Sequence, residues 1–219
     1  MLQDICCHAD DTASQSLLKA DWVNNMKEIR CEGCGEITLN HDAINFTSMD
    51  QGCRLLCSQC FNAEVARLRG LESFDNIRIQ PIGITDCAGE THQFHFTQRL
   101  LGNMVALDAV ELREGNPDGY QFQMIGDPEG DSFALLWHLV TKIRRTLSVR
   151  HITDDDRHGL QIADQTVRGR IEGDYSGAER APVVVVDGRE ISWDDFGQML
   201  MTFEGWQFKL EIRDISEEL

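Results

Sequence analysis

The chain has 219 residues, of which 42% are hydrophobic, and its formal net charge is −17. The hydrophobic fraction suffices for a packed core and excludes a disordered chain, and the length allows one large domain or two to three small ones. The charge disfavours nucleic acid as a partner, because phosphates repel an acidic protein unless its basic residues gather on one face. No stretch reaches the roughly 20 apolar residues of a membrane span, so we expect no membrane association.

The first residues indicate the compartment. Met1 to Asp4 has neither the basic start nor the apolar run of a signal peptide. The eight cysteines are then better explained by metal binding in a reducing cytoplasm than by disulfides. Within the polar start, Cys6-Cys7-His8 has metal-ligand chemistry without a matching motif nearby. A partly packed terminus explains this cluster, and a second metal site completed from elsewhere in the fold stays open.

An N-terminal helix is predicted from Ser14 to Glu28, where apolar residues fall on one helical face. These residues are Leu18, Trp22, Val23 and Met26.

Two Cys-x-x-Cys pairs follow, and they are the strongest motif of the chain. Their members are Cys31, Cys34, Cys57 and Cys60. A Cys-x-x-Cys turn directs two sulfurs at one ion about 2.3 Å away, and two such turns complete a tetrahedral zinc site. We therefore predict one structural Zn²⁺ per chain, bound by these four thiolates. A redox motif of thioredoxin type would need a strand-to-helix turn in a βαβ unit, and the sequence shows none.

Two further residues could join this site. Cys53 lies four residues before Cys57, and His41 lies in the same loop. Both rank below the four named cysteines, because only those four form two symmetric turns.

The surroundings of the pairs resemble a treble-clef zinc finger of the GATA-like or LIM-like kind over about residues 29–70. Two short strands are predicted between the pairs, and the second pair opens a helical run that ends at Gly70. The resemblance implies that the four cysteines bind zinc, and it leaves function open, since such fingers bind DNA, RNA, proteins or nothing. The nuclease version of this fold needs a histidine, and the helix offers Asn62 and Glu64 instead.

Residues 71–152 are predicted to form an antiparallel β-meander followed by an amphipathic helix. Strand patterns cover 77–84, 93–96, 105–112 and 120–124, and Asn116-Pro-Asp-Gly119 is predicted as the turn of the last hairpin. Asp131 is the expected N-cap of the helix. The apolar helix positions are Phe133, Leu136, Trp137, Val140, Ile143 and Leu147.

The meander also holds the best enzymatic candidate, Asp86, His92 and His95. These residues could bring three ligands to one ion, which would suit a metal-dependent hydrolase. Strand alternation, however, places the two histidines on opposite faces, so we expect surface histidines and no catalytic residues. Because no P-loop, nucleophile elbow, HExxH motif or dinucleotide fingerprint is present, the sequence favours a binding protein over an enzyme.

The C-terminal part is predicted as a polar linker, 153–164, and an acidic ββαβ module, 165–219. Asp187-Gly188 is a hairpin turn, and Ser192 begins a helix with a capping box. Trp206 to Ile212 is predicted as a last alternating strand, with Trp193 and Trp206 in the core.

The expected protein is thus of the α+β class, with three domains. These are 1–70, the N-terminal helix and the four-cysteine zinc finger; 71–152, the meander and helix; and 165–219, the ββαβ module. The favoured function is a cytoplasmic, zinc-stabilised binding or adaptor protein with a protein partner. Residues 151–219 carry 16 acidic and 7 basic residues, which suggests an inhibitor or regulator that contacts a basic surface.

Two other functions stay open. The first is a nucleic-acid-binding regulator in which Arg54, Arg67 and Arg69 contact phosphates. The second is the hydrolase described above. A homo-oligomer formed through an edge strand of the meander is a further hypothesis.

Overall fold

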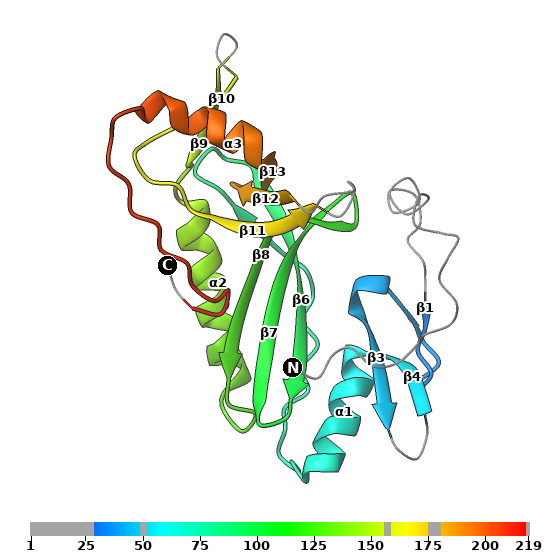
Figure 1. Ribbon diagram of the computed structural model, residues 1–219. Coiled ribbons are helices and arrows are strands. Elements are labelled where there is room, and N and C mark those ends of the chain that lie inside the picture. Colours follow the sequence, from blue (N-terminus) through cyan, green and yellow to red (C-terminus); the bar gives the residue numbers. More distant parts are fainter. Residues whose placement is uncertain (1–28, 49–51, 156–158, 175–180, 218–219) are drawn as a thin grey trace, which may run out of the picture.

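A computed structural model describes residues 29–48, 52–155, 159–174 and 181–217. The predicted N-terminal helix and Cys6-Cys7-His8 lie outside these residues. Within the described chain, three helices and thirteen strands form small antiparallel sheets, so the predicted α+β class is confirmed. Figure 1 shows a central sheet with the cysteine-containing segment beside it and the C-terminal elements at one end.

The cysteine-containing segment consists of two hairpins and a helix. Its elements are β1 (Ile29–Arg30), β2 (Ile37–Thr38), the 3-10 turn η1 (Asn40–Asp42), β3 (Ala43–Ser48), β4 (Gly52–Cys57) and α1 (Ser58–Arg69). β1 pairs with β2, and β3 pairs with β4. α1 ends where predicted, at Gly70, because the left-handed conformation there (φ 67°) is one that glycine adopts without strain.

The central sheet is a four-stranded meander in chain order. Its strands are β5 (Ile82–Thr85), β6 (Thr91–Leu101), β7 (Met104–Arg113) and β8 (Asn116–Gly126), and α2 (Ser132–Leu147) covers one face. Asp131 caps α2 as predicted, since its carboxylate accepts the amides of Phe133 and Ala134. The core contains Phe94, Phe96, Leu107, Ala109, Phe122, Leu139, Ile143 and Leu147.

The last hairpin of the meander differs from the prediction. Its turn lies at Glu114 and Gly115, which both have positive φ (52° and 82°), and β8 already begins at Asn116. Gly119 (φ 75°) instead serves a β-bulge, where the β7–β8 register shifts between Val110 and Leu112. Both glycines can supply a left-handed residue, so the local sequence alone does not decide which one forms the turn.

The C-terminal elements form two small sheets and a helix. They are β9 (Ile152–Asp155), β10 (Gly159–Ile162), β11 (Gly169–Asp174), β12 (Ala181–Val186), β13 (Arg189–Ser192), α3 (Trp193–Leu200) and the 3-10 turn η2 (Met201–Phe203). β9 and β10 pair as a hairpin within the segment expected to be a linker. The predicted turn at Asp187 and Gly188 is confirmed, with φ of 48° and 69°. Ser192 caps α3 as predicted by accepting the amide of Asp195.

The predicted last strand is absent, and the predicted burial of Trp193 and Trp206 in the core is wrong. Trp206 to Ile212 belongs to no strand, and Trp206 and Trp193 are 62% and 50% exposed. Figure 1 shows the chain leaving the end of α3 and running back beside α2. Lys142 of α2 donates to the carbonyls of Ile215 and Glu217 there. The alternating residues therefore lie away from the β11–β13 sheet, and no strand of the described residues pairs with them.

Candidate metal centres

The structure brings the four predicted cysteines together. Cys31 follows β1, Cys34 lies in the turn before β2, Cys57 ends β4, and Cys60 lies in the first turn of α1. Their sulfur atoms all lie within 4.8 Å of one another. Four thiolates about 2.3 Å from one ion would lie about 3.8 Å apart, so modest closure of this cluster could hold a metal ion.

Backbone amides prepare one of these sulfurs for an ion. The amides of Gly33 and Cys57 donate to Cys31 Sγ at 3.3 and 3.2 Å. Burial raises the pKa of Cys31, but the amides outweigh it and bring that pKa down to about 6. Burial raises the pKa of Cys57 and Cys60, so these thiols would need the charge of an ion to lose their protons.

The glycines of the first turn have separate roles. A Cβ atom on Gly33 would lie 2.9 Å from Cys60 Sγ, so glycine is needed for the two Cys-x-x-Cys turns to approach each other. Gly35 has φ +76°, the left-handed conformation that glycine tolerates.

The two lower-ranked candidate ligands, Cys53 and His41, lie outside the cluster. Cys53 is exposed, and the ring of His41 contacts that of His95, with centroids 4.8 Å apart.

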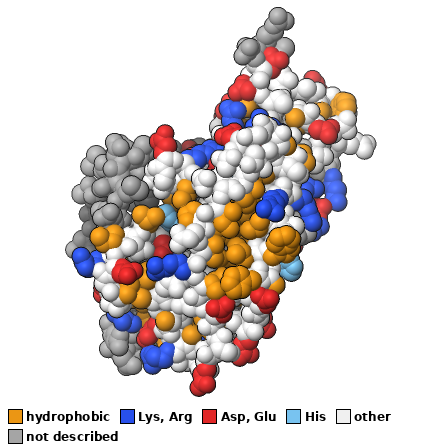
Figure 2. Space-filling model, turned by 180° about the vertical axis from the view of Figure 1, so that it is seen from behind, with side chains coloured by type: hydrophobic (Ala, Val, Ile, Leu, Met, Phe, Trp, Pro, Cys, Tyr) orange, Lys and Arg blue, Asp and Glu red, His pale blue; other side chains and the backbone are white. Residues whose placement is uncertain are grey.

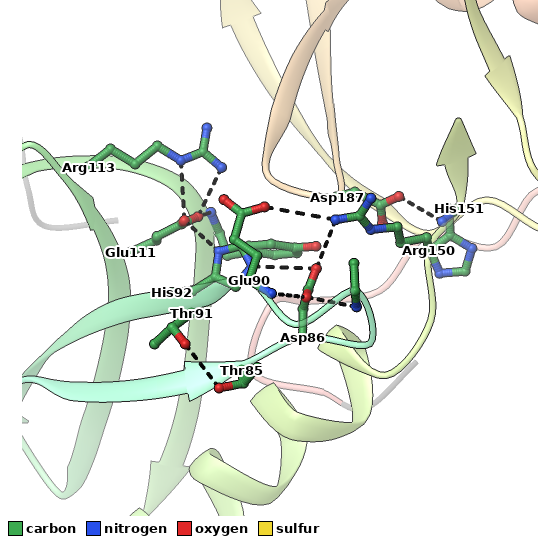
Figure 3. Close-up of polar contacts among 12 residues, drawn as sticks. Thr85, Asp86, Glu90, Thr91, His92, Glu111, Arg113, Arg150, His151 and Asp187 are labelled. Carbon is green, nitrogen blue, oxygen red and sulfur yellow. Dashed lines mark hydrogen bonds and ion pairs between the residues drawn. The ribbon is translucent and has the colours of Figure 1, made fainter. Parts of the chain in front are cut away.

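The second predicted group is brought together only in part (Figure 3). Asp86 and His92 do meet, but Glu90 takes the expected place of His95, and the ligand atoms of the three lie within 4.8 Å of one another. His95 is on the other face of β6, as strand alternation predicts. His92 is only 7% exposed, so the expectation of a surface histidine is wrong for this residue. His92 lies on the buried face of β6 beside Phe94, so a polar side chain continues this face of the core.

Sequence reasoning missed Glu111, which is 3% exposed and contacts His92 of β6 from the neighbouring strand β7. Its Oε1 lies 2.7 Å from His92 Nδ1, and its other oxygen accepts the amide of Tyr120 at 3.0 Å. Burial raises the pKa of Glu111, but His92, Tyr120 N and Arg113 outweigh it and hold that pKa below its usual value. The signal was available, since Glu111 is an acid on the same strand face as Leu107 and Ala109.

Comparisons with known proteins divide the chain into three consecutive matches. Each matching family model is described as a domain of unknown function: DUF7685 matches residues 30–72, DUF7686 matches 75–148, and DUF7713 matches 151–217. No curated protein and no solved structure matches the chain. Among the helices of the described residues, none has the length and apolar character needed to cross a membrane.

Proposed function

We propose that the protein is a zinc-stabilised binding protein that engages a protein partner through its C-terminal segment, residues 206–212. One observation carries this proposal. The apolar residues of the segment alternate with polar ones, and all four are exposed: Trp206 62%, Phe208 91%, Leu210 71% and Ile212 70%. In an extended chain, alternate residues share one face, so these four side chains would form a continuous apolar stripe along the segment.

The backbone of the segment supports the same proposal. Among the described residues, no backbone–backbone hydrogen bond involves residues 207–212. An extended segment with free amides and carbonyls and one apolar face can add as a strand to the edge of another protein's sheet. On its polar face, Glu211 pairs with both Lys209 and Arg213.

Further apolar surface lies on α2, beside which the C-terminal chain runs. Phe133 and Trp137 are 68% and 64% exposed, although both belong to the predicted apolar face of α2. They are four residues apart and so lie on one side of the helix. Figure 2 shows hydrophobic side chains gathered on the face of the molecule opposite to that of Figure 1. Such gathered apolar surface is typical of interaction sites.

The metal would be Zn²⁺ in a treble-clef finger, with a structural role. The order of knuckle, hairpin and helix supports this fold. The core of the finger is small: Cys31, Leu56 and Cys57, with Phe46, Cys60 and Phe61 against them. A segment of this size lacks the core to fold alone, and zinc supplies the missing stability.

Charge favours a basic protein over nucleic acid as the partner. Two of the three arginines that could contact phosphates pair with one acid, since Glu64 lies 3.6 Å from Arg54 and 2.9 Å from Arg67. The chain carries a net charge of −17, and its last third is its most acidic part. A partner with basic residues around a free strand edge would match both the apolar stripe and this charge.

The proposal is tested with a photo-cross-linking amino acid at position 208 of the full-length protein, in cells that express it. Leu68 of α1 is 58% exposed and serves as the matched position for the same amino acid. We expect one discrete adduct with a different protein from position 208 only, and its loss on Leu210→Asp. The purified partner should then bind wild type at least tenfold more tightly than Leu210→Asp, and more weakly as salt rises. Equal adducts from both positions, or adducts with a second copy of the chain alone, would refute the proposal.

A further inference from the structure

His92 presents a buried nitrogen for which the described chain supplies no hydrogen-bond partner. This atom, Nε2, lies 3.8 Å from Asp86 Oδ2, which is too long for a hydrogen bond. The other ring nitrogen, Nδ1, lies 2.7 Å from Glu111 Oε1. A carboxylate can only accept, so in the neutral ring Nδ1 carries the proton and Nε2 directs its lone pair toward Asp86. In the neutral form of the ring, two acceptors therefore face each other across a short gap.

We propose that Asp86, Glu90 and His92 bind a divalent transition-metal ion at a site separate from the four cysteines. Two ligand atoms each about 2.1 Å from one ion at tetrahedral angles lie about 3.4 Å apart. The Asp86–His92 gap of 3.8 Å is close to this spacing, and all three ligand atoms lie within 4.8 Å of one another. The ion would satisfy the lone pair of His92 and both carboxylates at once.

Glu111 would act as the outer partner of this site. A metal-binding histidine usually donates the N–H of its second ring nitrogen to a carboxylate, carbonyl or water, which fixes the ring and makes the ligand more basic. Glu111 occupies that position, and it is itself held by Arg113 and by the amide of Tyr120. The β8 bulge at Gly119 places this amide beside Glu111, so a local irregularity of the sheet supports the site.

The loop between β5 and β6 holds Asp86 in place before any ion binds. Asp86 Oδ1 accepts the amides of Ala88 and Glu90, both at 2.8 Å, and the Asp86 amide donates to the Glu90 carbonyl. The next amide, that of Cys87, donates to the carbonyl of Leu147 at the end of α2. Such a fixed ligand costs little further ordering when an ion binds.

Exposed side chains form the solvent side of the site. The Glu90 side chain is 68% exposed, whereas those of Asp86 and His92 are each 7% exposed. Glu90 would therefore close the site from outside, and further coordination positions would remain for water. Three protein ligands with open positions are typical of reactive rather than structural zinc sites.

Arg150 occupies this solvent side in the structure. Its guanidinium lies 3.0 Å from Asp86 Oδ2 and 3.8 Å from Glu90 Oε2, and half of its side chain is exposed (Figure 3). Its positive charge therefore offsets the negative charges of Asp86 and Glu90 next to the position proposed for the ion. An ion must compete with this guanidinium. The exposed arginine can move into solvent, which makes it a gate for the site.

The ligand set selects the class of ion. One imidazole and two carboxylates without sulfur suit Zn²⁺ or Mn²⁺, whereas Ca²⁺ and Mg²⁺ prefer oxygen ligands only. The four thiolates of the first cluster select Zn²⁺ and disfavour Mn²⁺. The two sites can therefore be distinguished by metal preference.

The test is titration of the full chain, loaded with one Zn²⁺ at its cysteines, with Zn²⁺ by calorimetry and with Mn²⁺ by electron paramagnetic resonance. We expect one further ion per chain, lost in Glu90→Gln and in His92→Gln. Because Glu90 is exposed, Glu90→Gln should keep the fold even if His92→Gln disrupts it. The matched control is His95→Gln, on the same strand but outside the cluster, which should bind as wild type does.

Two positioning residues sharpen the test. Glu111→Gln should weaken the second ion on the order of 10- to 100-fold, as outer partners of metal-bound histidines do. Arg150→Ala should strengthen it, because the competing cation is gone. A wild-type protein that binds no ion beyond the cysteine site, or a second ion that survives Glu90→Gln and ignores Arg150→Ala, would overturn the proposal.

Discussion

The side chain of Asn62 pairs with the backbone of Leu100 as a neighbouring strand would. Its Oδ1 accepts the Leu100 amide at 2.8 Å, and its Nδ2 donates to the Gln98 carbonyl at 2.8 Å. β5 covers β6 only as far as Phe94, so this part of the edge is free of a strand. Asn62 is completely buried, and it joins α1 of the cysteine-containing segment to the central sheet.

Replacement of Asn62 should therefore loosen this junction. Asn62→Leu leaves an amide and a carbonyl of β6 buried without partners, at a cost of about 2–4 kcal/mol in the free energy of unfolding. Urea denaturation of the full chain measures this loss. The control is Asn45→Leu on β3, an exposed position in the same segment, which should change stability by less than about 0.5 kcal/mol. Equal effects of the two substitutions would contradict the pairing role.

Loss of Cys31 should remove one metal ion and the structure around it. Cys31 is 1% exposed and accepts two backbone amides, so serine there leaves those donors with a weaker acceptor. We expect Cys31→Ser to lose one zinc per chain by elemental analysis and to lose hydrogen-exchange protection over residues 29–48 and 52–70. The matched control is Cys53→Ser, which changes an exposed thiol outside the cluster and should keep both. Zinc retained in Cys31→Ser would exclude the four-thiolate site.

Features set by neighbouring residues could be predicted from sequence. The Asp131 cap, the turn at Asp187 and the two Cys-x-x-Cys pairs each depend on a few adjacent residues, and the structure contains all of them. Glu111 could not be assigned to His92, because that contact depends on the register between β6 and β7. The register is fixed by the whole hairpin, which no local pattern specifies.

The C-terminal segment shows a second limit. The alternation from Trp206 to Ile212 predicts a strand, and the residues have the required β propensity. A strand also needs a neighbour, however, and the described chain supplies none. Alternation therefore indicates a face suited to pairing without indicating whether the partner belongs to the same chain.

Asp187 should stabilise the junction between the central sheet and the C-terminal module. Its Oδ2 accepts the amides of His151 and Ile152 at 2.7 and 2.9 Å, and its backbone is left-handed. Asp187→Ala removes both bonds and strains the turn, so we expect a loss of about 3 kcal/mol in the free energy of unfolding. Asp187→Asn keeps an acceptor and tolerates the turn, and it should lose about 1 kcal/mol. Denaturant titration compares the two, and equal losses would show that the turn alone matters.

Acid should weaken the contact between the cysteine-containing segment and the sheet through His41 and His95. Burial lowers the pKa of both rings, the neighbouring histidine lowers that of His41 further, and Asp42 partly opposes these effects. The folded protein therefore keeps both rings neutral at pH values where the unfolded chain, with histidine pKa about 6.5, already binds protons. Their contribution to stability is complete above about pH 6.5 and is lost as pH falls through the lowered folded pKa values.

The measurement is urea denaturation of the full chain at about pH 7.5 and about pH 5.5, with zinc held constant. The double variant His41→Gln with His95→Gln should lose less stability between the two pH values than wild type does. Acid also protonates the cysteine thiolates, but this contribution is common to both proteins and cancels in the comparison. His138→Gln, at an exposed position of α2, should retain the wild-type pH dependence. An unchanged dependence in the double variant would show that the histidine pair does not sense pH.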